Sequence, residues 1–167
     1  MKRVAKRTKR TRPSEKTYRA IGRFIFEFSQ LEYEIRHQVA EAVDVPIWHF
    51  NEIMVHDFTI LCKAALSVFK FAYTTEEHRW KKMEPLLKKA LGLGNIRNAV
   101  AHGLWVPFVE GGKVIHVPRS MKPSVSIKQA ETLEKKADEA RAVRIAIAAI
   151  TDEDLNVNYK RRGRVWR

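Results

Sequence analysis

The sequence predicts an all-α fold: an antiparallel bundle of four main helices with a small β-hairpin inserted before the last one. Two observations lead to this prediction. Apolar residues recur every three or four positions over several long segments, which is the period of an amphipathic helix. One segment near residue 110 alternates instead and contains a glycine pair, as a hairpin does. The 167 residues are enough for one domain with a sizeable core.

The first helix is predicted to run from Ser14 to about Val43. Its apolar stripe consists of Ile21, Ile25, Phe28, Leu31, Ile35 and Val39. Glu32 lies eleven positions after Ile21, which at about 100° per residue brings it back to within about 20° of the same direction. A carboxylate inside the apolar arc needs a charged or hydrogen-bonded partner, or it must escape to an edge.

Phe26 and Tyr33 lie one heptad apart on a different face of this helix and form a second, weaker aromatic stripe. The stripe is either a contact surface for a partner or a pair of scattered exposed aromatics, which many proteins have. In the first case the chain could serve as a structural or assembly subunit.

Pro46 ends the first helical segment, and a second helix is expected from near Asn51 to Ala72. Its buried stripe is predicted to contain Ile53, Phe58, Leu61, Ala65, Val68 and Phe69. A third helix is expected to begin where Thr74 and Glu77 fit the Thr-x-x-Glu capping box. The apolar face of the third helix consists of Trp80, Met83, Leu87 and Leu91.

The third helix also contains residues that disfavour a regular helix. Pro85 near its start, with Gly92 and Gly94 near its end, predicts a kink or a short interruption before "NIRNAVAHG". Gly103 is well placed as the residue that follows the C-cap.

The period changes after this helix. Leu104–Val109 and Lys113–Val117 are predicted to form two short strands joined across "EGGK", and Pro107 makes the first of them an edge strand. The last helix is expected to begin at a second capping box, formed by Ser126 and Gln129. Its buried stripe is predicted to contain Ile127, Leu133, Ala137, Ala140, Ile147 and Ile150. Short connections favour antiparallel neighbours, and hence an up-and-down bundle.

The net charge of +13 is located almost entirely at the two ends of the chain. Residues 1–12 hold seven Lys/Arg, residues 160–167 hold five, and neither segment contains an acid. Such segments are either arms that bind nucleic acid or tails that increase solubility. Tyr159 and Trp166 lie beside the C-terminal arginines, which suits stacking on bases. The candidate nucleic-acid-binding residues are Lys2, Arg3, Lys6, Arg7, Lys9, Arg10, Arg12, Lys160, Arg161, Arg162 and Arg164.

These features divide the chain into a basic arm at 1–13, a helical domain at 14–157 with the hairpin at about 104–117, and a basic tail at 158–167. The single cysteine, Cys62, excludes an intramolecular disulfide, and no zinc-finger or His-Glu-x-x-His spacing occurs. No apolar run approaches the roughly 20 residues of a membrane-spanning helix. We expect a cytoplasmic protein with no membrane contact that needs neither a metal nor a cofactor.

The stretch "GNIRNAVAHGLW" brings Arg97, Asn98 and His102 to the end of the third helix. Asn98 and His102 are four residues apart and therefore share a face, which Arg97 flanks with a long side chain. The helix dipole favours the charged imidazole at a C-terminus, and histidine changes charge near neutral pH, which suits proton transfer. The spacing alone is no more frequent than chance. The alternative is structural: Arg97 pairs with Glu32 or another acid, and His102 hydrogen-bonds the helix end.

"IRNAVAHGLW", together with "FIFEFSQLEYEI" in the first helix, resembles the HEPN superfamily of all-helical domains. The hallmark of that family is arginine followed by four to six residues and histidine, usually with Asn, Asp or His after the arginine. Arg97, Asn98 and His102 match this motif, and "FSQLE" is similar to the first-helix pattern of many members, where Glu32 would be the acidic residue. The resemblance covers the helical body at about 17–150.

The resemblance implies a metal-independent endoribonuclease of a toxin–antitoxin or other defence system. It implies a homodimer in which both motifs face one cleft, RNA as substrate, and an antitoxin protein as a possible partner. His102 would act as general base or acid, Arg97 would hold the scissile phosphate, Asn98 would orient the histidine or the phosphate, and Glu32 would support the site.

One position departs from part of the family. Members paired with a nucleotidyltransferase antitoxin have a tyrosine two residues after the histidine, and this chain has Leu104 there. We therefore do not expect antitoxin control through that tyrosine. Because some members of the family show no nuclease activity, the alternative is a non-catalytic helical module that binds nucleic acid or a protein.

Overall fold

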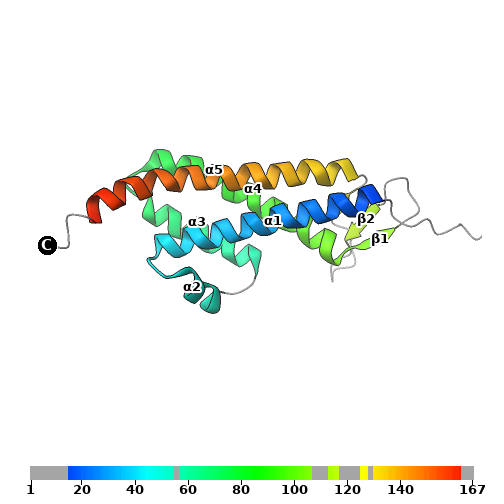
Figure 1. Ribbon diagram of the computed structural model, residues 1–167, viewed down its shortest axis with the longest axis horizontal. Helices are drawn as coiled ribbons and strands as arrows, with labels where there is room; N and C mark the ends of the chain where they lie inside the picture. Colours follow the sequence, from blue (N-terminus) through cyan, green and yellow to red (C-terminus); the bar gives the residue numbers. More distant parts are fainter. Residues whose placement is uncertain (1–14, 55–56, 107–112, 117–124, 128–129, 163–167) are drawn as a thin grey trace, which may run out of the picture.

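The fold is a bundle of long helices with a small sheet at one end (Figure 1). The computed structural model describes residues 15–54, 57–106, 113–116, 125–127 and 130–162. In chain order the elements are α1 (Glu15–Ala42), α2 (Ile47–Ile53), α3 (Phe58–Ala72), α4 (Glu77–His102), β1 (Leu104–Val106), β2 (Lys113–His116), β3 (Val125–Ile127) and α5 (Ala130–Arg162). The prediction of a mainly helical fold is confirmed.

The core lies between α1, α3, α4 and α5. The predicted stripe of α1 faces it: Phe28, Leu31, Ile35 and Val39 are buried, and Ile21 and Ile25 are partly buried. Buried residues of the other helices are Leu61, Ala65 and Phe69 of α3, Met83 and Leu87 of α4, and Leu133, Ala137, Ala140, Ile147 and Ile150 of α5, all of which the periodicity predicts. Full burial of one large aliphatic or aromatic side chain contributes roughly 1.5–3 kcal/mol, so these stripes provide the main stabilisation of the bundle.

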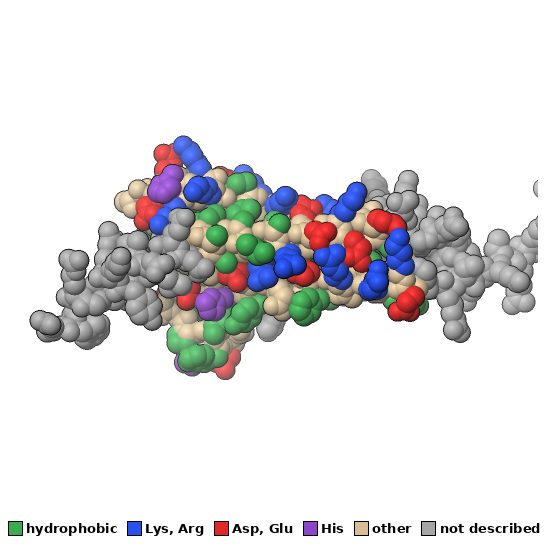
Figure 2. Space-filling view, turned by 45° about the horizontal axis from the view of Figure 1, so that its top comes forward, with side chains coloured by type: hydrophobic (Ala, Val, Ile, Leu, Met, Phe, Trp, Pro, Cys, Tyr) green, Lys and Arg blue, Asp and Glu red, His purple; other side chains and the backbone are tan. Residues whose placement is uncertain are grey.

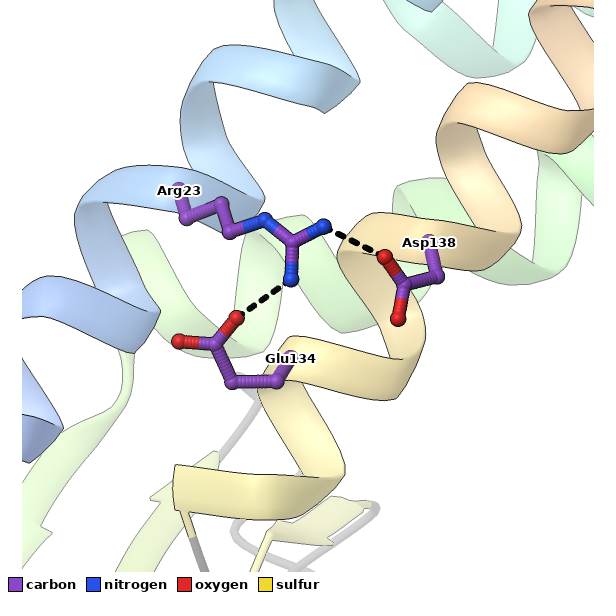
Figure 3. Close-up of polar contacts among 3 residues, drawn as sticks. All are labelled: Arg23, Glu134 and Asp138. Atoms are coloured by element: carbon purple, nitrogen blue, oxygen red, sulfur yellow. Dashed lines mark hydrogen bonds and ion pairs between the residues drawn. The ribbon is translucent and has the colours of Figure 1, made fainter.

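α1 and α5 run in the same direction, so the prediction of an antiparallel up-and-down bundle is wrong. Lys16 pairs with Glu131, and Arg23 pairs with both Glu134 and Asp138. The residue numbers of the partners therefore increase together along the two helices, and the paired residues are 111 to 115 positions apart in the sequence. The two helices lie side by side in Figure 1, and Figure 3 shows the Arg23 fork reaching both carboxylates.

The helix predicted from near Asn51 to Ala72 is two helices. The backbone is extended at Met54, and α3 begins after Asp57, whose side chain accepts a hydrogen bond from the Ile60 N–H at 2.9 Å. An aspartate at this position satisfies one of the free N–H groups at a helix start. The expected burial of Ile53 is also wrong, because the residue belongs to α2 and is exposed.

α4 does not begin with the predicted capping box. Its N-cap is Glu76, and the Thr74 hydroxyl donates instead to the backbone carbonyls of Lys70 and Phe71 at the end of α3. The expected interruption is also absent, since α4 is one continuous helix that contains Pro85. The proline lies in the third turn, where it removes a single backbone hydrogen bond that the packing of the neighbouring turns can offset.

The three strands form an antiparallel sheet in the order β1-β2-β3. Leu104 lies opposite Ile115, and Ser126 lies opposite the same residue from the other side. The expected "EGGK" turn lies outside the described residues. The capping box predicted at Ser126 and Gln129 is wrong, because Ser126 pairs in β3, and so does Ile127, which the pattern had assigned to the last helix.

α5 continues to Arg162, beyond the predicted boundary between the helical domain and the basic tail at 157/158. No helix in the described part of the chain is both long and apolar enough to cross a membrane.

Candidate functional site

The candidate site occupies the last two turns of α4, where one side of the helix is fixed in the core. Ala99 and Val100 are buried, and they hold this end of the helix against the bundle. Asn98 and His102 lie on the opposite side and are exposed, while Arg97 is half-buried between the two. The predicted convergence of three polar residues at the helix end is therefore compatible with how this turn packs.

Arg97 lies across an aromatic ring of α1. Its guanidinium carbon is 6.0 Å from the centre of the Phe28 ring, a cation–π distance, and its Nη1 donates to Oδ1 of Asn98 at 3.2 Å. No carboxylate of the described residues pairs with Arg97. The structural alternative, in which Arg97 pairs with Glu32 or another acid, is therefore not found among the described residues, and most of the guanidinium's donors remain available to a ligand.

The ring beneath Arg97 is supported by α3. Phe28 packs against Phe58 with the ring centres 4.6 Å apart. Gly94 allows this approach, because a Cβ at that position would lie only 2.6 Å from Cδ1 of Phe58. Gly94 is also one turn before Arg97 on α4. Three helices thus meet in a stack of Gly94, Phe58, Phe28 and Arg97, which we call the Arg97 seat.

Glu32 lies one turn beyond Phe28 on α1, close to the seat, but its partner is Arg36. The Arg36 Nη2 donates to Glu32 Oε1 at 3.0 Å, and the Arg36 side chain is buried. The expectation that a carboxylate in the apolar arc needs a charged partner is confirmed. The proposed supporting role of Glu32 is weakened by this ion pair, which occupies one of its oxygens.

Cys62 of α3 lies near Glu32 of α1 and is not a nucleophile in this environment. Burial, reinforced by the negative charge of Glu32, raises the pKa of the thiol to about 12. A thiol in this state is protonated at neutral pH and behaves as a small apolar side chain.

His102 occupies the last position of α4, and the chain leaves the helix in an extended conformation. Gly103 has φ −79° and ψ 156°, and its N–H donates to the Ala99 carbonyl. The prediction that Gly103 follows the C-cap is wrong, because Gly103 is itself the C-cap and the chain enters β1 directly at Leu104. The sheet therefore begins immediately beside His102.

Three of the candidate nucleic-acid-binding residues lie in the part of the chain that the structure describes. Lys2, Arg3, Lys6, Arg7, Lys9, Arg10, Arg12 and Arg164 lie outside the described residues. Lys160, Arg161 and Arg162 belong to the final turns of α5. In Figure 1 these turns lie at the end of the bundle opposite the sheet and the α4 terminus.

An open depression at the α3–α4 turn, about 500 Å³ in volume, is lined by Ser67, Lys70, Phe71, Tyr73, Thr74, Glu77 and Trp80. It is distant from the candidate site, because α4, which has 26 residues from Glu77 to His102, spans about 37 Å. Within the described ranges no three His, Cys, Asp or Glu residues are arranged to hold a metal ion.

Sequence reasoning missed two residues of this region. The partner of Glu32 could have been found, because Arg36 is four positions away on the same helix, which is the spacing of a helical ion pair. The contact between Arg97 and Phe28 could not have been found from the sequence, because it depends on how α1 and α4 pack.

No family model, curated protein or solved structure matches the chain. The function must therefore be argued from the site itself and from the resemblance of its motif.

Proposed function

We propose that this protein is a HEPN-like, metal-independent endoribonuclease of a toxin or defence system. The observation that supports the proposal most is the state of Arg97. Its guanidinium is held over Phe28, hydrogen-bonded to Asn98, and unpaired with any carboxylate in the described part of the chain. A positioned guanidinium with open donors suits a phosphodiester, to which it can donate two parallel hydrogen bonds.

The proposed reaction is attack of a ribose 2′-hydroxyl on the adjacent phosphorus. The new bond joins the 2′-oxygen to phosphorus, the bond from phosphorus to the 5′-oxygen breaks, and the products are a 2′,3′-cyclic phosphate and a 5′-hydroxyl. His102 would remove the 2′-proton or give a proton to the leaving oxygen. Arg97 would neutralise charge that develops on the phosphate, and Asn98 would orient Arg97.

The described last turns of α4 carry one histidine, His102, whereas this reaction uses both a base and an acid. We propose that two chains form a homodimer in which the ends of both α4 helices border one cleft that binds RNA. The exposure of Asn98 and His102 supports this arrangement, since these residues remain available to a second copy and to substrate.

The test is cleavage of RNA by the purified full-length protein in EDTA. Arg97→Ala and His102→Ala are each expected to reduce the rate constant at least 100-fold, in line with the usual contribution of a general base or an anion-stabilising group of roughly 10²–10⁴. Arg97→Lys, which keeps the charge and loses the planar fork, should retain only part of the activity.

Two controls match these variants in chemistry. His78→Ala removes an exposed histidine at the opposite end of α4, and Arg19→Ala removes an exposed arginine of α1. Both should cleave RNA like the wild type. The proposal fails if wild type and variants cut equally, or if no variant cuts, including the wild type.

The second candidate is a non-catalytic module that binds nucleic acid, for which the concentration of basic residues at the two ends is the supporting observation. It predicts RNA or DNA binding that weakens steeply with salt, is lost when residues 1–12 and 160–167 are removed, and does not depend on His102.

A further inference from the structure

Arg36 of α1 carries a buried charge whose burial is only partly compensated. Its side chain is 8% exposed, its Nη2 donates to Glu32 Oε1 at 3.0 Å, and its Nη1 is buried with no hydrogen-bond partner among the described residues. Figure 2 shows basic and acidic side chains side by side on the surface that α1 and α5 form, where their ion pairs are open to solvent. A buried pair with an unsatisfied donor adds little stability over apolar side chains of similar volume. Stability alone therefore does not explain Arg36.

The acid that Arg36 holds lies beside the Arg97 seat. Phe28 and Glu32 are four residues apart on α1, so they share a face and lie about 6 Å apart along the helix. The guanidinium carbon of Arg97 is 6.0 Å from the centre of the Phe28 ring. The charge of Glu32 also acts on Cys62 of α3, so its carboxylate lies toward α3, which supports the same ring. A Glu32 carboxylate that Arg36 did not hold could turn along this face towards Arg97.

A second acid beside the seat is occupied as well. Asp57 immediately precedes Phe58, and as the N-cap of α3 its carboxylate accepts the Ile60 N–H at 2.9 Å. Carboxylates thus adjoin both rings of the seat, and each has a partner elsewhere. Arg97 pairs with neither of them and donates to an amide oxygen instead. An arginine close to two acids remains unpaired only if those acids are held by other groups.

We propose that Arg36 is a positioning residue, which keeps Arg97 available to phosphate by holding Glu32 in an ion pair within α1. A carboxylate on the Arg97 guanidinium would occupy the same donors that a phosphodiester uses, so it would compete with RNA. Arg36 prevents this competition without touching the substrate. The inference rests on the proposed role of Arg97 in binding phosphate, and it adds a residue that lies outside the Arg-x4–6-His motif.

The first test observes Arg97 in the full-length protein without RNA. Arg36→Met removes the charge and keeps an unbranched side chain. The NMR signal of the Arg97 Nε–H group, assigned by its loss in Arg97→Lys, should shift in this variant because Glu32 now pairs with Arg97. Adding Glu32→Gln to Arg36→Met should return the signal to its wild-type position. Arg36→Lys, which still offers Glu32 a cation, should leave the signal nearly unchanged.

The second test adds inorganic phosphate and follows the same signal. Arg36→Met should need at least about fivefold more phosphate for half of the shift, and Glu32→Gln should reverse this loss. Cleavage of RNA in EDTA should fall at least about tenfold in Arg36→Met. The matched control is Arg23→Met, because Arg23 is an arginine of the same helix that pairs with Glu134 of α5, and it should change neither readout. Circular dichroism checks the fold of each variant, and Arg36→Gln replaces Arg36→Met if the latter does not fold.

The proposal is overturned if the Arg97 signal and the phosphate affinity stay unchanged in Arg36→Met, or if phosphate does not move the wild-type signal. A loss that Glu32→Gln does not reverse also overturns it, because Arg36 would then have a structural role only. Absence of RNA cleavage by the wild type would instead contradict the proposed nuclease, since the Arg97 signal and the phosphate affinity are measured without RNA.

Discussion

At the scale of single residues, the candidate site depends on a chain of contacts that starts with the absence of a side chain. Gly94 lets Phe58 approach α4, Phe58 supports Phe28, and Phe28 lies under Arg97. A long arginine side chain has considerable rotational freedom, which must be lost when it holds a phosphate. The Arg97 seat restricts that freedom before any ligand binds.

Replacing Gly94 by Ala should destabilise the protein, because the new methyl group would force Phe58 out of its position. We expect the free energy of unfolding to fall by about 1–2 kcal/mol, with the overpacking cost exceeding the gain in helix propensity. Gly92→Ala is the matched control in the same helix, since a Cβ there meets nothing within 4 Å. It should raise stability by up to about 1 kcal/mol. Urea unfolding of both variants measures the difference, and equal effects would contradict the proposed packing.

Cys62 should not react with thiol reagents in the folded protein. With the pKa of its thiol at about 12, only about one molecule in ten thousand is ionised at pH 8, and the side chain is buried as well. Labelling by a chromogenic disulfide reagent should therefore follow unfolding, and it should be fast in 8 M urea. Rapid labelling without denaturant would show that the α1–α3 interface opens in the native state.

At the scale of elements, the parallel pairing of α1 and α5 is the main feature that the sequence pattern did not predict. Short loops favour antiparallel neighbours, but after α2 the chain re-enters the bundle opposite the middle of α1, where Phe58 at the start of α3 packs against Phe28. Figure 1 shows α1 and α5 beginning at the same end. The direction of packing then depends on charge as well as on connection length.

The charges on the two helices contain a signal for this direction. The first half of α1 carries Lys16, Arg19 and Arg23, and its second half is acidic. α5 begins with Glu131, Glu134 and Asp138 and then carries Arg141 and Arg144. A parallel arrangement places the basic first turns of α1 beside the acidic first turns of α5, as the ion pairs of Lys16 and Arg23 show.

Reversing the charge of Arg23 should reveal the pairing. Arg23→Glu is expected to lower the melting temperature, because it faces Glu134 and Asp138 with a like charge. Adding Glu134→Arg to Arg23→Glu should recover part of the loss, so the two changes should be non-additive in a double-mutant cycle. Additive effects in calorimetry would contradict direct contact between these residues.

Acid should weaken the pairing of α1 with α5. The hydrogen bond from Lys16 lowers the pKa of Glu131 below its ordinary value of 4.5. A carboxyl whose pKa is lower in the folded protein stabilises it above the unfolded pKa, and this contribution is lost as the pH falls through the folded pKa. Stability should therefore decline below about pH 4.5, and part of the decline should disappear in Glu131→Gln. Urea unfolding from pH 7 to pH 3 tests this, and identical pH profiles for the two proteins would exclude a contribution from Glu131.

At the scale of the whole molecule, the sequence predicted the composition of the core better than its arrangement. Phe28, Leu31 and Leu133 follow a period set by helix geometry, which any arrangement of helices would satisfy. Local capping motifs predicted the structure less well than the periodicity. Ser126 fits a capping box, yet it pairs in β3. Local capping motifs compete with strand pairing to residues elsewhere in the chain, which no short sequence window contains.

The same limit applies to the candidate site. Arg97, Asn98 and His102 could be singled out because they lie within six residues of one helix end, and their spacing fixes which of them share a face. The seat under Arg97 could not be predicted, since it needs the relative placement of three helices. The ion pair of Glu32 with Arg36 also showed that a polar residue in an apolar arc can be explained within its own helix.

The whole molecule also concentrates its basic residues at the two ends of the chain. RNA binding should therefore depend on the ends and on Arg97, and should be insensitive to the exposed residues of α2. Filter binding of RNA by Trp48→Ala should match that of the wild type at each salt concentration. A large loss in this variant would contradict RNA binding through the ends of the chain and Arg97.

The most direct test of the account is to identify the ends of the RNA that the protein produces. A 5′-labelled RNA of defined sequence is incubated with the full-length protein in EDTA, alongside His102→Ala and the control His78→Ala. Wild type and His78→Ala should generate fragments that end in a 2′,3′-cyclic phosphate, and His102→Ala should not. Fragments that end in a 3′-hydroxyl, or cleavage that requires added Mg²⁺, would contradict attack by the 2′-hydroxyl at the α4 terminus.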